Sequence, residues 1–222
     1  MRTPDSWQTA QATVAIAVVT GLVHLVLSVF QVEPWAVMWG SFIPATLDPV
    51  MAARFQVELG FAHAPFFVTP LTATLLHADI FHLVFNLLML LFCGRAVEGA
   101  VGRVGLIILY VAGAFAAAAG QFAIDPSSPV PMIGASGAIS AVIGAYAMLF
   151  GRNRVRVANN KLAMWLNVLW LLVAWVVLQI ALAVVVSAST SGILLAVGAH
   201  VGGFVAGVAL ARPLLLWRYR KA

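Results

Sequence analysis

Long apolar segments alternate with short polar links along most of this chain. A helix needs about 20 mostly apolar residues to cross a membrane, because each residue adds about 1.5 Å along its axis. Charged, proline-containing or Ser/Thr/Gly-rich stretches divide the apolar residues into six segments of about this length. The pattern therefore predicts six transmembrane helices, over residues 12–30, 79–97, 104–123, 133–150, 162–186 and 193–210.

Composition supports a membrane environment. Hydrophobic residues make up 63% of the chain and charged residues 9%, whereas soluble domains have roughly 45–50% and about 25%. A protein with so few charged residues could not keep its surface hydrated. We therefore expect lipid to surround it. We expect one polytopic membrane domain over residues 1–222, without a separate soluble domain. No soluble basic face with interleaved aromatic residues is visible, so we expect no nucleic-acid partner.

The basic residues indicate an orientation. All but one of the 12 lysine and arginine residues lie before the first segment, in or beside the links after the second and fourth segments, or after the sixth. Arg54 is the exception. Cytoplasmic loops of membrane proteins are enriched in lysine and arginine. We therefore expect a multi-pass membrane protein with both termini in the cytoplasm.

The long connection over residues 31–78 is expected on the outer side. Its several prolines exclude one continuous helix. Residues 50–59 could form a short helix, with Arg54 and Glu58 paired at the i,i+4 spacing. Tryptophan and phenylalanine residues nearby are typical of a segment that lies in the membrane interface. We therefore expect a partly helical interfacial loop.

Four polar residues fall in segments that run from outside to inside. His82 and Asn86 lie in the first turns of the second segment and share one helix face, because four residues separate them. Ser136 lies in the first turn of the fourth segment, and His200 about two turns into the sixth. At about 1.5 Å per residue, all four lie roughly 5–12 Å below the outer helix ends. The pattern predicts one polar layer that opens to the outer face.

Small residues surround the serine and the histidine. Helices in lipid approach closely where such residues meet. Gly134 and Gly137 flank Ser136, and Gly203 and Gly207 form a small-xxx-small pair after the histidine. We therefore expect the fourth and sixth helices to pack closely enough for Ser136 to meet His200.

The paired serine and histidine suggest hydrolysis inside the membrane. A serine hydroxyl is a poor nucleophile until a base removes its proton, and His200 is the candidate base. No Asp or Glu lies within the fourth or sixth segment, so we expect a dyad rather than a triad. The developing oxyanion needs donors, which Asn86, a ring N–H of His82 and the first-turn N–H of Ser136 could supply.

Four motifs, in this order, make the chain resemble the rhomboid intramembrane serine proteases. They cover residues 76–87, 94–98, 134–138 and 199–203, and the likeness extends over about 71–210. The resemblance implies an all-α membrane protein with a compact six-helix core of the bacterial type, and so a place in a bacterial inner or plasma membrane. It also implies cleavage of transmembrane protein substrates in the lipid bilayer, without a cofactor or a metal.

The resemblance also implies a role for individual residues. Ser136 would be the nucleophile and His200 the general base, while His82, Asn86 and the Ser136 N–H would bind the oxyanion. His77 would hold the first outer loop, and Glu98 would stabilise a loop near the inner end of the second segment. Many rhomboids carry an aromatic residue four positions after the serine, packed on the histidine. Here that position is Ser140, so a different neighbour must hold His200.

Other function classes account for less of the pattern. A catalytically silent rhomboid-like protein that binds membrane clients would usually lack the serine or the histidine. A haem-binding electron carrier could use His82 and His200 as axial ligands, but this leaves Ser136 and Asn86 unexplained. A transporter would need a charged residue at mid-membrane, and none is found. The substrate and the oligomeric state stay open.

Overall fold

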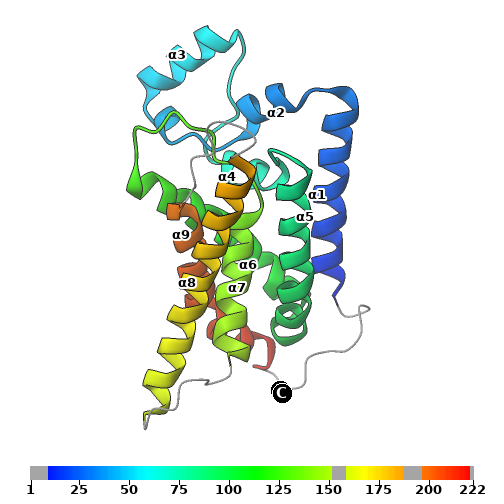
Figure 1. Ribbon diagram of the computed structural model, residues 1–222, viewed down its shortest axis with the longest axis vertical. Coiled ribbons are helices and arrows are strands. Elements are labelled where there is room, and N and C mark those ends of the chain that lie inside the picture. The colour runs from blue at the N-terminus through cyan, green and yellow to red at the C-terminus, as the bar shows by residue number, and fades with distance from the viewer. Residues whose placement is uncertain (1–9, 152–158, 188–196, 221–222) are drawn as a thin grey trace.

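Helices account for nearly all of the regular structure in the computed structural model, which describes residues 10–151, 159–187 and 197–220. The long helices run side by side along the long axis of the molecule, with α2 and α3 at one end and the C-terminus at the other (Figure 1). The long helices are α1 Gln11–Phe30, α5 Ile80–Met89, α6 Arg95–Ile124, α7 Ser136–Phe150, α8 Asn160–Ser187 and α9 Val197–Arg218.

Four helical runs in the described part of the chain are long and apolar enough to cross a membrane. One of them, Ile80–Ile124, covers both the second and the third predicted segments. It contains a π-helical turn, Leu90–Gly94, and Gly102 (φ 81°) divides its second half into two helices across a kink. α7 is apolar but shorter, with 15 residues. The protein is therefore an all-helical membrane protein, and the count of six spans stays a prediction.

Two predicted ends of the apolar segments differ from the structure or lie largely outside its described residues. The fourth segment was expected from residue 133, but α7 begins at Ser136, because Gly134 has a positive φ of 106° that helical backbone does not allow. The predicted break at residues 187–192 and the predicted start of the sixth segment at 193 lie largely outside the described residues. The described part of the last helix begins at Val197.

Glycines allow α6, α7 and α9 to pack together at the centre of the bundle. A Cβ added to Gly203 would overlap the carbonyl oxygen of Gly137, and one added to Gly207 would overlap that of Ala141. A Cβ on Gly137 would in turn meet Ala117 of α6. Only hydrogen fits at these positions. The close approach predicted for the helices that carry Ser136 and His200 is confirmed.

Residues 31–78 are partly helical, as predicted. They contain α2 Glu33–Gly40, α3 Pro49–Leu59 and α4 Thr69–Thr72, with short 3-10 turns at Pro44–Leu47 and Ala73–Leu75. The Asp48 side chain accepts hydrogen bonds from the N–H groups of Val50 and Met51, which caps the start of α3. Phe42 and Met132 exchange two backbone hydrogen bonds, which tie this segment to the residues just before α7.

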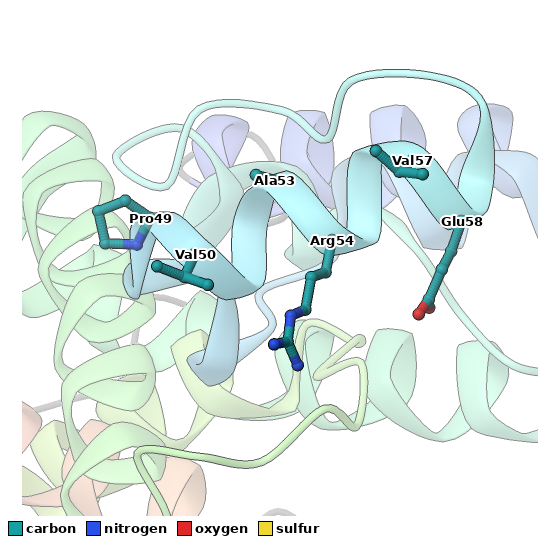
Figure 2. Close-up of a pocket in the computed structure, with 6 residues that line it drawn as sticks. All are labelled: Pro49, Val50, Ala53, Arg54, Val57 and Glu58. Atoms are coloured by element: carbon teal, nitrogen blue, oxygen red, sulfur yellow. The ribbon is translucent and has the colours of Figure 1, made fainter.

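α3 projects beyond the end of the helical bundle (Figure 1), and an open hollow lies along it (Figure 2). The residues that line it all belong to α3. Arg54 and Glu58 project from the same side of the helix (Figure 2), but the described residues contain no ion pair between them. The predicted i,i+4 pair is therefore not formed. Val57 is 83% exposed, which fits a helix that faces the membrane interface.

Glu98 fixes the start of α1 against α6. Its carboxylate accepts hydrogen bonds from the N–H of Ala12 (2.9 Å) and from the N–H and hydroxyl of Thr13 (2.8 and 2.7 Å). The residue is 2% exposed. Glu98 was expected to stabilise a loop, but it caps a helix instead, because the first N–H groups of a helix lack intrahelical acceptors.

We expect Glu98→Gln to lower the thermal stability of the protein. A glutamine offers one acceptor oxygen in place of two, so a buried donor of α1 loses its partner, at a cost of about 1–3 kcal/mol. Heat-induced unfolding in detergent would measure the change. Glu58→Gln is the matched control, because Glu58 is exposed on α3. Equal unfolding temperatures for Glu98→Gln and the control would contradict this role.

His63 should make stability depend on pH. Burial lowers the pKa of His63 below the usual 6.5, and its buried Nε2 has no hydrogen-bond partner among the described residues. The unfolded chain therefore binds a proton at a higher pH than the folded chain does, and stability falls as the pH drops below 6.5. We expect His63→Gln to lose less thermal stability than the wild type between about pH 7.5 and about pH 5. Equal losses would exclude His63 as the cause.

Candidate active site

Ser136 and His200 meet at the interface of α7 and α9. The hydroxyl oxygen of Ser136 lies 2.9 Å from Nε2 of His200, and the two residues are 6% and 5% exposed. When the imidazole carries its proton on Nδ1, Nε2 accepts the serine hydroxyl proton. This is the geometry of a nucleophile beside its general base.

The backbone just before α7 fixes the position of Ser136. Gly134 has a positive φ of 106°, and a Cβ at this position would lie 2.7 Å from the ring of His82, so a glycine is needed for both reasons. The N–H of Ala135 donates to Nε2 of His77 at 3.4 Å. His77 thus ties the end of the first outer loop to the segment that leads into α7, and its expected role in holding that loop stays a prediction. Because Ser136 is the first residue of α7, its N–H has no intrahelical acceptor.

His82 of α5 lies beside this site, and Asn86 follows one turn later on the same helix. The Asp79 side chain accepts a hydrogen bond from the N–H of His82 at 2.9 Å and so caps the helix. The His82 ring lies against Gly134 and makes an edge contact with His77, with a centroid distance of 5.0 Å. The amide nitrogen of Asn86, which is fully buried, donates to the carbonyl of His82 at 2.8 Å. That nitrogen carries a second hydrogen that is free to bind another acceptor.

Trp175 of α8 packs beside His200. The sequence alone did not identify this neighbour. Its ring lies edge-on to the imidazole, with a centroid distance of 6.3 Å and an angle of 75° between the planes. Its Nε1–H donates to the Ser140 hydroxyl at 2.8 Å, and this hydroxyl donates to the carbonyl of Ser136 at 2.7 Å. An aromatic ring from another helix thus occupies the place next to the histidine that Ser140 leaves open.

Gln179 is a second α8 residue that the sequence analysis missed. Its side-chain nitrogen lies 3.3 Å from Nε2 of His200. The available signal was its position, because it is the single polar side chain in the apolar stretch over residues 168–186. In the described part of the chain, Nδ1 of His200 is buried without a hydrogen-bond partner, and no group of three or more His, Cys, Asp or Glu residues could hold a metal ion.

Comparison with known proteins gives the family. A family model named Rhomboid domain matches residues 67–217. The Rhomboid protease GluP of Bacillus subtilis (strain 168) is 34% identical over 145 residues, which are 64% of this chain and 26% of that protein. The matched region thus covers about a quarter of this relative's length. Because the family model spans more than half of the chain and the structure is an all-helical membrane protein, the protein belongs to the rhomboid family.

Proposed function

We propose that this protein is an intramembrane serine endopeptidase that hydrolyses peptide bonds in or near transmembrane segments of other membrane proteins. The observation that carries the proposal is the 2.9 Å distance between the Ser136 hydroxyl and Nε2 of His200, in a buried site. The similarity to a rhomboid protease supports the same reaction class.

In the proposed reaction, the Ser136 oxygen attacks the scissile carbonyl carbon while Nε2 of His200 takes the hydroxyl proton. The resulting imidazolium gives this proton to the leaving amine as the C–N bond breaks, which leaves an acyl group on Ser136. His200 then removes a proton from water, and the hydroxide attacks the acyl carbon. The proton returns to the serine oxygen, so the dyad is restored.

Three donors would stabilise the negative charge on the carbonyl oxygen: the N–H of Ser136, a ring N–H of His82 and the second hydrogen on the amide nitrogen of Asn86. Ser136 and Asn86 are buried. Fixed donors act more strongly in such a site than in water, because there is little solvent to screen them.

We expect Asn86→Ala to lower kcat by about 10²–10³-fold, which is typical for the loss of one oxyanion donor. The KM for a membrane-protein substrate should change little, because the lost hydrogen bond forms only as charge develops. Asn167→Ala is the matched control, since Asn167 is a buried asparagine in the N-terminal half of α8. If both variants lose activity equally, Asn86 has no special part in the reaction.

The protease function can be tested with purified protein in lipid bilayers. We expect cleavage of some members of a panel of single-span proteins, and labelling by a fluorophosphonate at a site that mass spectrometry assigns to Ser136. A catalytically silent relative would bind such proteins without cleaving them and would leave Ser136 unlabelled. Either result, no cleavage together with no adduct or an adduct on a different residue, would refute the proposal.

We also infer six spans with both termini in the cytoplasm, where α5 and α6 supply the second and third spans and α7 the fourth. α3 and the C-terminus lie at opposite ends of the molecule (Figure 1). Arg54 belongs to α3, and Arg220 is close to the C-terminus in sequence. An Arg54→Cys variant in intact cells should react with a membrane-impermeant thiol reagent, whereas Arg220→Cys should not. The native Cys93 is buried and gives little background.

A further inference from the structure

Among the described residues, the Nδ1 side of the His200 imidazole has no hydrogen-bond partner. This Nδ1 is buried. In a triad, a carboxylate at this nitrogen fixes the ring. Without one, the ring must be held through its other nitrogen and its faces, and α8 supplies the contacts there.

Gln179 contacts the nitrogen that would carry the transferred proton. Its amide nitrogen lies 3.3 Å from Nε2 of His200, and the residue is buried. In the neutral imidazole, the N–H of Gln179 shares Nε2 as an acceptor with the Ser136 hydroxyl, which is the closer donor. In the imidazolium, Nε2–H can instead donate to the amide oxygen of Gln179. A glutamine can therefore keep contact with the ring in both of its protonation states.

Trp175 holds the same ring by packing. It lies four residues before Gln179, so both side chains emerge from one face of α8. Its indole lies edge-on to His200, stacks on Phe85 of α5 at 5.9 Å, and donates a hydrogen bond to Ser140. Through Ser140 it is linked to the carbonyl of Ser136. The contacts from α8 therefore reach both members of the dyad.

We propose that α8 positions the general base, with Gln179 holding Nε2 of His200 beside Ser136 and Trp175 fixing the plane of the ring. This inference rests on the proposed protease function. Neither residue reacts with substrate in this scheme: both are positioning residues that set the geometry of the Ser136–His200 pair.

Gln179→Met tests the amide, because methionine keeps the length and flexibility of the side chain but cannot make the hydrogen bond. We expect kcat to fall roughly 3- to 10-fold, as for the loss of one neutral hydrogen bond, with KM unchanged. The ¹⁵N resonance of His200 Nε2 should also move, because its bonding partner has changed. Asn167→Leu removes a buried amide elsewhere on α8 and should leave that resonance in place.

Trp175→Phe provides a second test that keeps an aromatic ring beside His200. It removes the hydrogen bond to Ser140, as does Ser140→Ala from the other side. We expect each variant to slow acylation of Ser136 by a fluorophosphonate roughly 3- to 10-fold, and the double variant to be no slower than either one, because both remove the same bond. Fully additive losses would overturn the proposed link through Trp175.

The ¹⁵N resonance of His200 Nε2 distinguishes a failure of the positioning role from a failure of the proposed protease function. An unchanged His200 Nε2 resonance in Gln179→Met overturns the positioning role, whatever the activity. Absence of Ser136-dependent labelling in the wild type refutes the protease function, while the resonance still decides whether Gln179 holds the ring. If Gln179→Met and Asn167→Leu lower kcat and thermal stability equally, Gln179 is only a packing residue and the proposal fails.

Discussion

Ser136→Ala and His200→Ala are each expected to lower kcat by about 10⁴–10⁶-fold, the largest effect of any single change in this protein. The serine hydroxyl and Nε2 of His200 are 2.9 Å apart, so removal of either group leaves the other without its reaction partner. Because the two groups act as a unit, the double variant should be no less active than either single variant.

Initial rates of substrate cleavage in bilayers, with active protein counted by an independent measure of folding, would test this expectation. Ser128→Ala is a suitable control, because Ser128 is a buried serine outside the site. It should keep a rate close to that of the wild type. Substantial cleavage by Ser136→Ala would mean that a different residue is the nucleophile.

Gly207→Ala is expected to have the largest effect on folding of any change that adds only one methyl group. The new Cβ would overlap the carbonyl oxygen of Ala141 on α7, and backbone atoms cannot move aside as a flexible side chain can. Overpacking of this kind costs about 1–3 kcal/mol, and more where backbone must shift. The displaced α9 would also draw His200 away from Ser136, so fluorophosphonate labelling should slow together with the loss of stability.

Gly21→Ala on α1 is the matched control for that experiment. A Cβ at Gly21 would have its nearest neighbour, in the side chain of Leu87, at 3.8 Å, an ordinary van der Waals contact. Alanine is a better helix former than glycine by about 1 kcal/mol, so Gly21→Ala should be neutral or stabilising. Equal unfolding temperatures for the two variants would show that α7 and α9 tolerate a wider separation.

Several parts of the fold could be predicted because they depend on local sequence. The apolar segments, the partly helical connection over residues 31–78 and the glycine-lined contact between α7 and α9 all follow from residue type and spacing. Helix ends were predicted less well, since α7 starts only after the positive φ of Gly134. Arg54 and Glu58 have the right spacing for an ion pair but do not form one, because exposed pairs of this kind contribute little energy.

The candidate site also has features that the sequence predicts and features that only the structure shows. The order of Ser136, His200, His82 and Asn86 along their helices follows from the sequence, and the structure brings Ser136 and His200 into hydrogen-bond contact. Their common depth in the membrane stays a prediction. The partner of Glu98 could not be found by counting. It is the start of α1, more than 80 residues away along the chain, and it became visible only in the folded bundle.

The sequence by itself determined that this is a membrane protein and that it resembles the rhomboids. It also identified Ser136 and His200 as the candidate dyad. These features depend on hydrophobicity, helical spacing and short motifs, which are local properties of the chain. Only the tertiary structure decided that Trp175 and Gln179 are the neighbours of His200. The rotation of α8 about its axis is set by its packing against other helices. Apart from Gln179, the middle of α8 is apolar on all sides, so it carries no periodic pattern that marks its inward face.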